Sequence, residues 1–282
     1  MRPSNLAFSV LISLFTLGHP SVSSAQLTLY DDFGGGIIDP ERWFGTGQDG
    51  GVANPTTEVV RAIKSGRLQL RLNQYGSENS DSGTSTGQVR LNIPNGGSIT
   101  TLQAIVTVTS ADVGACATNP STTVRARAQV DGGFFNDGSS TGPADRTGDI
   151  IAGIQKMSDT ALGNVIQAFI VRCTNASCSA TGAVAGSGSQ VFTTAWAPNQ
   201  SHALTVQWDA ANHQFIYSVR HALRTFLFGK TETITLPYVE SDAHAPVVPF
   251  RQLVVNNSAA NCTGGQQHAF MDAFFDQVMI KP

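Results

Sequence analysis

The stretch SHALTVQWDAANHQFIYSV, residues 201–219, contains two runs of alternating side chains separated by Asp, Ala and Asn. In the first run Leu204, Val206 and Trp208 alternate with polar residues, and in the second run large apolar residues recur at every other position. Successive side chains of a strand point to opposite faces, so this period of two predicts two half-buried strands joined by a turn. We therefore expect Trp208 to lie in the core.

The same alternation recurs along most of the chain. In TVRARAQV, residues 123–130, Val124 and Ala126 face one way while Arg125 and Arg127 face the other. Similar segments are RLQLRLN, GQVRLNI, TLQAIVTVT, DIIAGIQKM, NVIQAFIVR, TETITL, FRQLVVN and AFFDQVMI, separated by Gly, Asn, Asp, Ser and Pro. SDTALGNVIQAF has a possible helix cap, but its Gly and Asn favour a turn between two strands. The absence of strand–helix alternation excludes a doubly wound parallel fold.

The amino terminus has the pattern of a secretory signal peptide. Arg2 precedes the apolar run Leu6–Leu17, and small residues lead to a cleavage site after Ala25. The apolar run is too short to span a membrane. We expect residues 1–25 to be removed and residues 26–282 to form a single domain in a secreted or periplasmic protein.

Composition narrows the class of partner. The chain has 282 residues, 28 glycines, 13% charged residues and a formal net charge of −3. Loss of residues 1–25 removes one arginine and no acid, and so changes this charge to −4. Such a weak charge argues against a nucleic-acid or anionic-membrane partner. The oligomeric state is not determined by these features.

Four cysteines, an even number in an exported protein, favour disulfides and allow three pairings. The segment CTNASC would close a tight loop, which favours Cys173–Cys178 and leaves Cys116–Cys262. A metal site is the alternative, but no CxxC or Cys/His cluster supports it.

Several segments together resemble the concanavalin A-like lectin and glucanase superfamily of jelly-roll sandwiches. DDFGGGIIDPERW, residues 31–43, resembles its first strand and the turn that ends in a tryptophan; residues 201–219 resemble its characteristic hairpin, and FFDQVMI its closing strand. The resemblance implies an all-β fold of two antiparallel sheets, a closing strand beside the first strand, and a groove on the concave sheet. Trp43 is then a structural plug. Activity does not follow, because one fold hosts many functions.

The family 16 glucanases of this fold carry two glutamates and an aspartate on one strand, and their retaining mechanism needs carboxylates about 5 Å apart. Residues 26–282 contain five glutamates, and none stands four or five residues from another: Glu41, Glu58, Glu78, Glu232 and Glu240. That catalytic motif is therefore absent.

Two weaker catalytic candidates remain. In PYVESDAHAP, Glu240, Asp242 and His244 alternate, but the flanking prolines indicate a loop whose polar cluster faces solvent. Alginate-lyase relatives of the fold use an Arg-rich strand, a Gln-x-His strand and a Tyr-bearing strand. Here Arg125, Arg127 and Gln155 supply part of that set without the histidine, and outward-facing arginines are more often solvated or ion-paired.

Members of this superfamily often hold a structural calcium near their first and last strands, and Asp32 with Asp276 would suit that place. The alternative is that Asp276 pairs with an arginine or with turn amides. Calcium needs about 6 to 8 oxygen ligands, most of which the sequence does not identify.

Sugar binding needs aromatic faces with amides or acids nearby. Trp196 lies in the expected loop TTAWAPN, which makes it the candidate for an exposed platform. In GGFFNDG, Phe134, Asn136 and Asp137 are candidate ligand contacts, with an ordinary strand end and turn as the alternative.

The leading hypothesis is a secreted, non-catalytic carbohydrate-binding protein, lectin-like, whose partner is a polysaccharide or glycan and which requires no cofactor. A divergent polysaccharide-degrading enzyme, either a glycoside hydrolase or a lyase, is the second hypothesis. A surface or matrix interaction protein without sugar specificity is the third.

Overall fold

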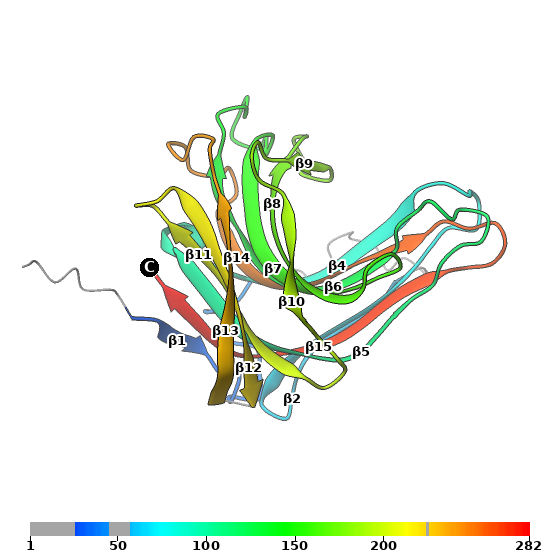
Figure 1. Cartoon of the computed structure of the whole chain (residues 1–282), viewed down its shortest axis with the longest axis horizontal. Helices are drawn as coiled ribbons and strands as arrows, with labels where there is room; N and C mark the ends of the chain where they lie inside the picture. Colours follow the sequence, from blue (N-terminus) through cyan, green and yellow to red (C-terminus); the bar gives the residue numbers. More distant parts are fainter. Residues whose placement is uncertain (1–25, 45–56, 224–225) are drawn as a thin grey trace, which may run out of the picture.

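A computed structural model describes residues 26–44, 57–223 and 226–282. The predicted signal peptide, residues 1–25, lies outside the described residues. Two antiparallel β-sheets pack face to face, as Figure 1 shows, and this confirms the predicted all-β jelly-roll sandwich. No helix of the described part is long and apolar enough to cross a membrane.

The first sheet, named the convex sheet here, has the strand order β13-β12-β11-β5-β15-β3-β2, with β1 paired to β15. Its strands are β1 (Thr28–Asp31), β2 (Thr57–Lys64), β3 (Arg67–Tyr75), β5 (Thr101–Val113), β11 (Ser201–Asp209), β12 (Gln214–Leu223), β13 (Phe226–Pro237) and β15 (His268–Lys281). The closing strand β15 lies beside β1, as the family resemblance implied.

The second sheet, named the groove sheet here, has the order β10-β8-β7-β6-β14-β4, with β9 paired to β8. Its strands are β4 (Thr84–Ile93), β6 (Arg125–Asn136), β7 (Asp149–Asp159), β8 (Gly163–Cys173), β9 (Thr181–Ala183), β10 (Ser189–Ala195) and β14 (Phe250–Ala260). A 3₁₀ turn, η1 (Gly96–Ser98), precedes β5. The segment SDTALGNVIQAF contains the predicted turn, residues 160–162, between the end of β7 and the start of β8.

The opening motif is held together by Asp31 at the end of β1. Asp31 accepts hydrogen bonds from the indole Nε1 of Trp43, at 2.6 Å, and from the backbone N–H of Phe33, at 2.7 Å. The rings of Phe33 and Trp43 stack with centroids 5.6 Å apart, and both are buried. Trp43 is therefore the structural plug that was predicted.

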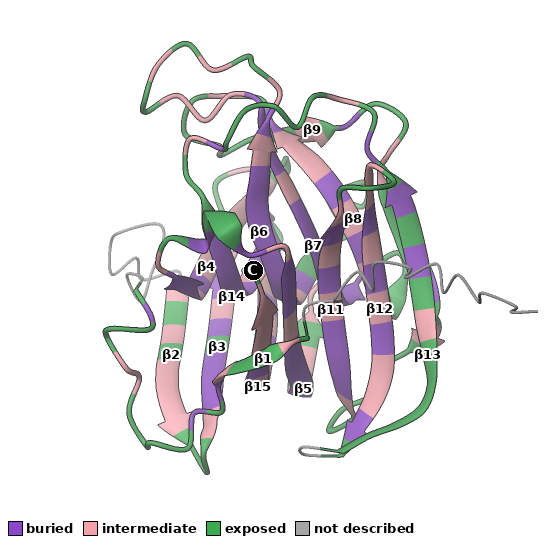
Figure 2. Cartoon of the chain, turned by 90° about the vertical axis from the view of Figure 1, so that its left-hand side faces the viewer, coloured by how far each residue is buried: buried purple, intermediate pink, exposed green. Residues whose placement is uncertain are grey.

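The core is built by the alternation seen in the sequence. In the hairpin of β11 and β12, Trp208 stands opposite Phe215 and Val206 opposite Tyr217, all directed between the sheets. Figure 2 shows buried residues running along the strands of both layers. Complete burial of one such large apolar side chain contributes about 1.5–3 kcal/mol, so this face fixes the register of the hairpin.

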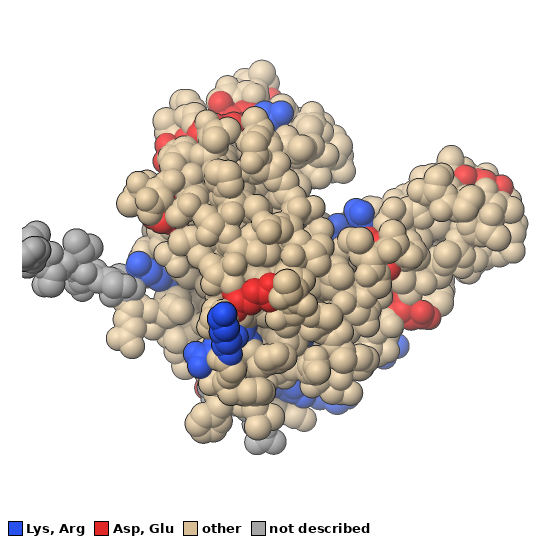
Figure 3. Space-filling view, in the orientation of Figure 1, with Lys and Arg blue, Asp and Glu red and all other residues tan. Residues whose placement is uncertain are grey.

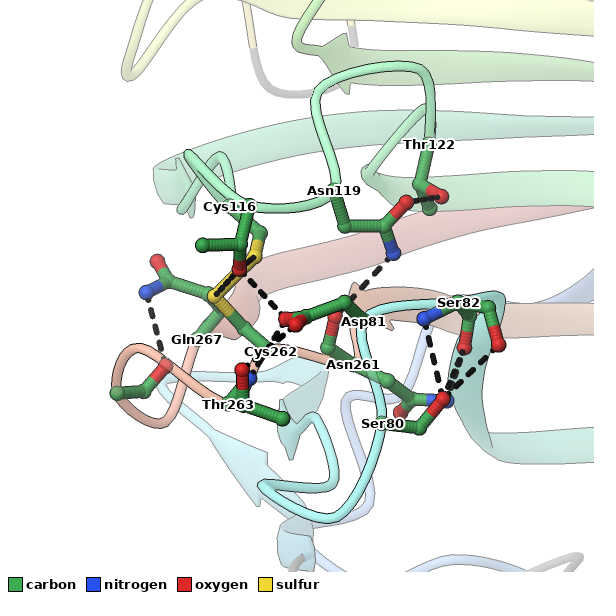
Figure 4. The surroundings of a disulfide bond; sticks show 12 residues. Ser80, Asp81, Ser82, Cys116, Asn119, Thr122, Asn261, Cys262, Thr263 and Gln267 are labelled. Atoms are coloured by element: carbon green, nitrogen blue, oxygen red, sulfur yellow. Dashed lines mark hydrogen bonds between the residues drawn. A yellow bond between two sulfur atoms is a disulfide. The ribbon is translucent and has the colours of Figure 1, made fainter.

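Two disulfides join the cysteines in the predicted pairs, Cys116–Cys262 and Cys173–Cys178. Figure 4 shows the first, at the end of the sandwich where the loops of residues 76–83, 114–124 and 261–267 meet. There Asp81 accepts hydrogen bonds from the hydroxyls of Thr118 and Thr263 and from the Thr263 N–H. We name this end of the molecule, on the right in Figure 1, the arm.

At the opposite end of the groove sheet, loops of residues 137–148, 174–180 and 238–249 form a second cluster, named the upper loops. Arg172 ties two of them together through ion pairs with Asp137 and Glu240. The Cys173–Cys178 disulfide lies at the base of this cluster. Each end of the groove sheet is thus anchored by one disulfide.

Candidate functional site

A groove of about 710 Å³ lies on the outer face of the groove sheet. Its floor is formed by β4, β14, β6, β7 and β8, and residues 177–179 of the upper loops contribute to one wall. In Figure 3 the surface is hollowed between the upper loops and the arm, and Lys or Arg atoms are visible at the base of the hollow. The family resemblance implied a groove on the concave sheet, and this groove lies across the central strands of the groove sheet.

A row of three glutamines crosses the floor. Gln129, Gln155 and Gln167 stand opposite one another on β6, β7 and β8. The side-chain amide of Gln129 donates to Gln155 Oε1, and that of Gln155 donates to Gln167 Oε1, both at 2.7 Å. Gln155 also donates to Met157 Sδ at 3.7 Å, and these bonds hold the amides in fixed orientations. The second lone pair of each acceptor oxygen can receive a hydrogen bond from a ligand hydroxyl.

Arg127 lies next to this row. Its Nη2 donates to Asn256 Oδ1 at 2.8 Å and to Ser258 Oγ at 3.2 Å, so both hydrogen-bonding side chains are neutral. Burial, together with the charge of Arg125, lowers the pKa of Arg127 to about 10, although the charges of Asp131 and Asp159 offset part of the fall. The guanidinium nevertheless stays positive at neutral pH.

Asp131 lies on the floor, opposite Gln252 of β14 and Gly153 of β7. It is 3% exposed, and its Oδ1 has no hydrogen-bond partner among the described residues. Burial raises the pKa of this carboxyl to about 7; a hydrogen bond from Gln252 and the charges of three arginines offset the rise only in part. Those arginines are Arg90, Arg127 and Arg251. A carboxyl with this pKa can gain or lose a proton near neutral pH.

Phe169 gives the groove an aromatic face beside Asp131. It stands opposite Gly153, where an added Cβ would lie 2.7 Å from the Phe169 ring and 2.4 Å from Asp131 Cβ. Only a glycine leaves room for the ring at this place. The phenyl is half-buried, with one part open to the groove.

The structure brings together three of the residues proposed from the sequence. Arg125, Arg127 and Gln155 all line the groove. Arg125 is also ion-paired to Asp159, at 2.7 Å. Their role in catalysis stays a prediction.

The predicted aromatic platform at Trp196 is wrong. Trp196 is only 3% exposed, and its Nε1 donates to the backbone carbonyl of Met157, so the ring packs in the core. Phe134 is also buried, edge-on to Phe215 and beneath the Arg251 guanidinium. Neither ring is open to a ligand.

The neighbouring polar candidates, Asn136 at the end of β6 and Asp137 in the upper loops, lie outside the groove lining. Asn136 is buried and donates to Asp149 Oδ1 and to the Thr147 carbonyl. Asp137 is ion-paired to Arg172 and accepts a hydrogen bond from the Ser139 N–H. These contacts match the alternative of an ordinary strand end and turn, and a role in ligand binding stays untested.

The segment with Glu240, Asp242 and His244 forms a loop, as its prolines indicated. Glu240 is ion-paired to Arg172, and Asp242 lies 3.4 Å from His213. None of the three candidate side chains lines the groove.

The calcium candidates Asp32 and Asp276 share a separate pocket on the outer face of the convex sheet. Burial raises the pKa of Asp276; Arg67 lowers it and the Asp32 charge raises it. Two carboxylates and the Gln277 segment are part of a calcium ligand set, but Arg67 lines the same pocket and competes for their charge. The fit to calcium is therefore partial.

The described residues hold one group of three side chains with metal-ligand spacing, Asp81, Cys116 and Cys262. Both sulfurs are in the disulfide, so they offer no thiolate. This cluster is structural.

Sequence reasoning did not single out Asp131, Gln167 and Phe169 as site residues. Asp131 continues the alternation of Arg125 and Arg127 along β6, which was the available signal. Gln167 and Phe169 come from β8, and only the pairing of β7 with β8 places them in the groove.

No family model and no curated protein matches the chain. Solved structures similar to it include lectin II from Ulex europaeus, 14% identical over 78% of this chain and 91% of that chain, with a TM-score of 0.34. Peanut lectin is 14% identical over 85% and 98%, with a TM-score of 0.33. A GH16 protein of Bacteroides ovatus mixed-linkage glucan utilisation is 12% identical over 86% and 97%, with a TM-score of 0.39.

Proposed function

We propose that this is a secreted carbohydrate-binding protein that holds a glycan chain in the groove of its groove sheet. The observation that carries the proposal is the row of fixed amides, Gln129, Gln155 and Gln167, beside the open face of Phe169. Amides bind sugar hydroxyls, and aromatic rings pack against the apolar face of a pyranose. The volume is within the range of about 300–1,000 Å³ typical of ligand sites.

A binding role is favoured over hydrolysis by the acids present. Asp131 is the single carboxylic acid among the described residues that line the groove. A retaining or inverting glycosidase of the usual kind needs two carboxyl groups at its centre.

The proposal is tested by measuring binding to a panel of soluble polysaccharides with affinity electrophoresis and calorimetry. The Gln155→Ala variant breaks the amide row and removes a ligand contact, so its affinity should fall by about tenfold. Gln69→Ala is the matched control, because Gln69 is buried and hydrogen-bonded on the convex sheet. Absence of binding to every glycan, or equal affinity in both variants, contradicts the proposal.

A second function, polysaccharide cleavage, is supported by one observation, the pKa of about 7 of Asp131 at the groove floor. A group with that pKa suits general acid–base chemistry. Reducing-sugar and unsaturated-product assays would detect turnover, and Asp131→Asn should abolish it while leaving glycan binding. No turnover on any bound glycan leaves the binding function alone.

A structural calcium at Asp32 and Asp276 is proposed as an accessory to the fold. If it binds, a chelator should lower the melting temperature of the wild type but not of Asp276→Asn. An unchanged wild-type melting temperature removes the calcium site.

A further inference from the structure

The groove carries positive charge on a chain whose formal net charge is −3. Four arginines line it, Arg90, Arg125, Arg127 and Arg146, whereas the described lining contains no lysine and one acid, Asp131. Two of these arginines are ion-paired to acids outside the lining, Arg125 to Asp159 and Arg146 to Asp149. This local excess is opposite in sign to the chain as a whole.

Arg127 is the centre of that excess. Its side-chain hydrogen bonds go to neutral acceptors, the carbonyl and side chain of Asn256 and the hydroxyl of Ser258. Arg125 stands two residues away on the same face and is paired with Asp159, whereas Arg127 has no such ion pair in the described chain. A half-buried guanidinium of this kind is stabilised by an anion that brings its own charge.

The geometry of the groove also indicates which kind of molecule carries the anionic group. Arg127 lies beside the amide row and Phe169 is on the next strand but one, so one ligand can place an acidic group at Arg127 and a ring face at Phe169. The planar guanidinium binds a carboxylate or a sulfate through two parallel N–H donors.

We infer that the glycan held in the groove is an anionic polysaccharide, whose carboxylate or sulfate groups bind at Arg127 with Arg90, Arg125 and Arg146 around them. The inference rests on the proposed function and names the class of its ligand. Arg127 sets the preference for charge, whereas the amides and Phe169 bind features common to neutral and acidic sugars.

The test measures binding of residues 26–282 by biolayer interferometry to four immobilised probes: a neutral β-glucan, a polyuronate, a sulfated galactan and single-stranded DNA. The expected result is binding to the polyuronate or the sulfated galactan, at least about tenfold tighter than to the neutral glucan. Affinity should fall as sodium chloride is raised, because salt screens exposed charges. Which of the two acidic probes binds better identifies the anionic group.

Variants locate the effect. Arg127→Gln should weaken binding to the acidic glycan by about tenfold or more, since it removes charge-assisted hydrogen bonds. Arg71→Gln is the matched control: it makes the same change in net charge on the outer face of the convex sheet, where Arg71 lies over the Phe270 ring. Melting curves of both variants establish that each is folded.

The outcomes separate the inference from the function on which it rests. Tight binding to neutral glucan, unchanged by salt and by Arg127→Gln, overturns the anionic class and leaves carbohydrate binding in place. Equal loss in Arg127→Gln and Arg71→Gln also overturns it, because net charge alone would then decide affinity. Binding to DNA in preference to the acidic glycans, or to none of the probes, refutes the inference and the proposed function together.

Discussion

Replacing Asp131 with asparagine should change the pH dependence of stability in a defined window. Folding raises the pKa of this buried carboxyl from 3.8 to about 7, so the native state binds a proton that the unfolded state releases. The free energy of unfolding of the wild type therefore falls as pH rises from about 4 to 7, and no further above it. A shift of this size corresponds to about 4 kcal/mol as an upper limit.

The Asp131→Asn variant lacks this proton. It keeps an acceptor for Gln252 but adds amide donors beside the arginines, which lowers its stability by a constant amount. This constant loss does not alter the slope of the free energy of unfolding against pH. Relative to the wild type, the free energy of unfolding of the variant should therefore increase between pH 4.5 and 7, by about 2–4 kcal/mol.

Urea denaturation at half-unit intervals from pH 4.5 to 8, followed by tryptophan fluorescence, measures that difference. Asp145→Asn is the control, since hydrogen bonds from Thr147 and Thr141 hold the pKa of Asp145 well below its usual range. Its difference from the wild type should stay constant over this interval. If Asp131→Asn also gives a constant difference, the carboxyl is ionised throughout and the reasoning is refuted.

Three further measurements test other parts of the structure. The Cys116–Cys262 bridge spans 146 residues, so replacing both cysteines by serine should lower the free energy of unfolding by about 5 kcal/mol. The same change at Cys173–Cys178, which spans 5 residues, should lower it by about 2 kcal/mol. Equal losses in denaturant unfolding would contradict this loop-length argument. Burial lowers the pKa of Lys156 from 10.5 to about 7, so the Lys156→Met variant should be more stable than the wild type at pH 6. The difference in the free energy of unfolding should shrink as pH rises towards 10, where the wild-type amine is neutral in the folded state. A difference independent of pH would exclude a buried ammonium. Gly153→Ala should displace Phe169 and weaken glycan binding measured by calorimetry, whereas unchanged affinity would remove Phe169 from the site.

Most strands could be predicted because their two faces differ. The residues of β6, β11 and β12 alternate between core and outer face, and this gives the period of two. The edge strands β2 and β10 were not predicted, because much of each is exposed and the apolar alternation is weak. Trp196 was placed wrongly for a related reason: its neighbours have the composition of a loop, yet the ring folds inward and bonds to Met157.

Only the candidate site residues that lie on one strand, β6, could be grouped from the sequence. Alternation put Arg125 and Arg127 on one face, but it gave no reason to prefer Asp131, because an isolated aspartate has an ordinary pKa. The raised pKa arises from burial among residues of β14, β7 and β8, which are distant in sequence.

The sequence by itself determined that the chain is built of half-buried strands, because alternation shows it, and the short CTNASC loop favoured the cysteine pairs that formed. The two-sheet jelly roll and the plug at Trp43 were implied by the family resemblance. Only the tertiary structure decided which strands lie side by side, and with them the row of Gln129, Gln155 and Gln167 and the surroundings of Asp131. The physical reason is that strand order and register are set by burial of the opposite, apolar face. The groove is formed by the outward-facing residues of the same strands, so the packing of the apolar face also decides which outward-facing residues lie next to one another.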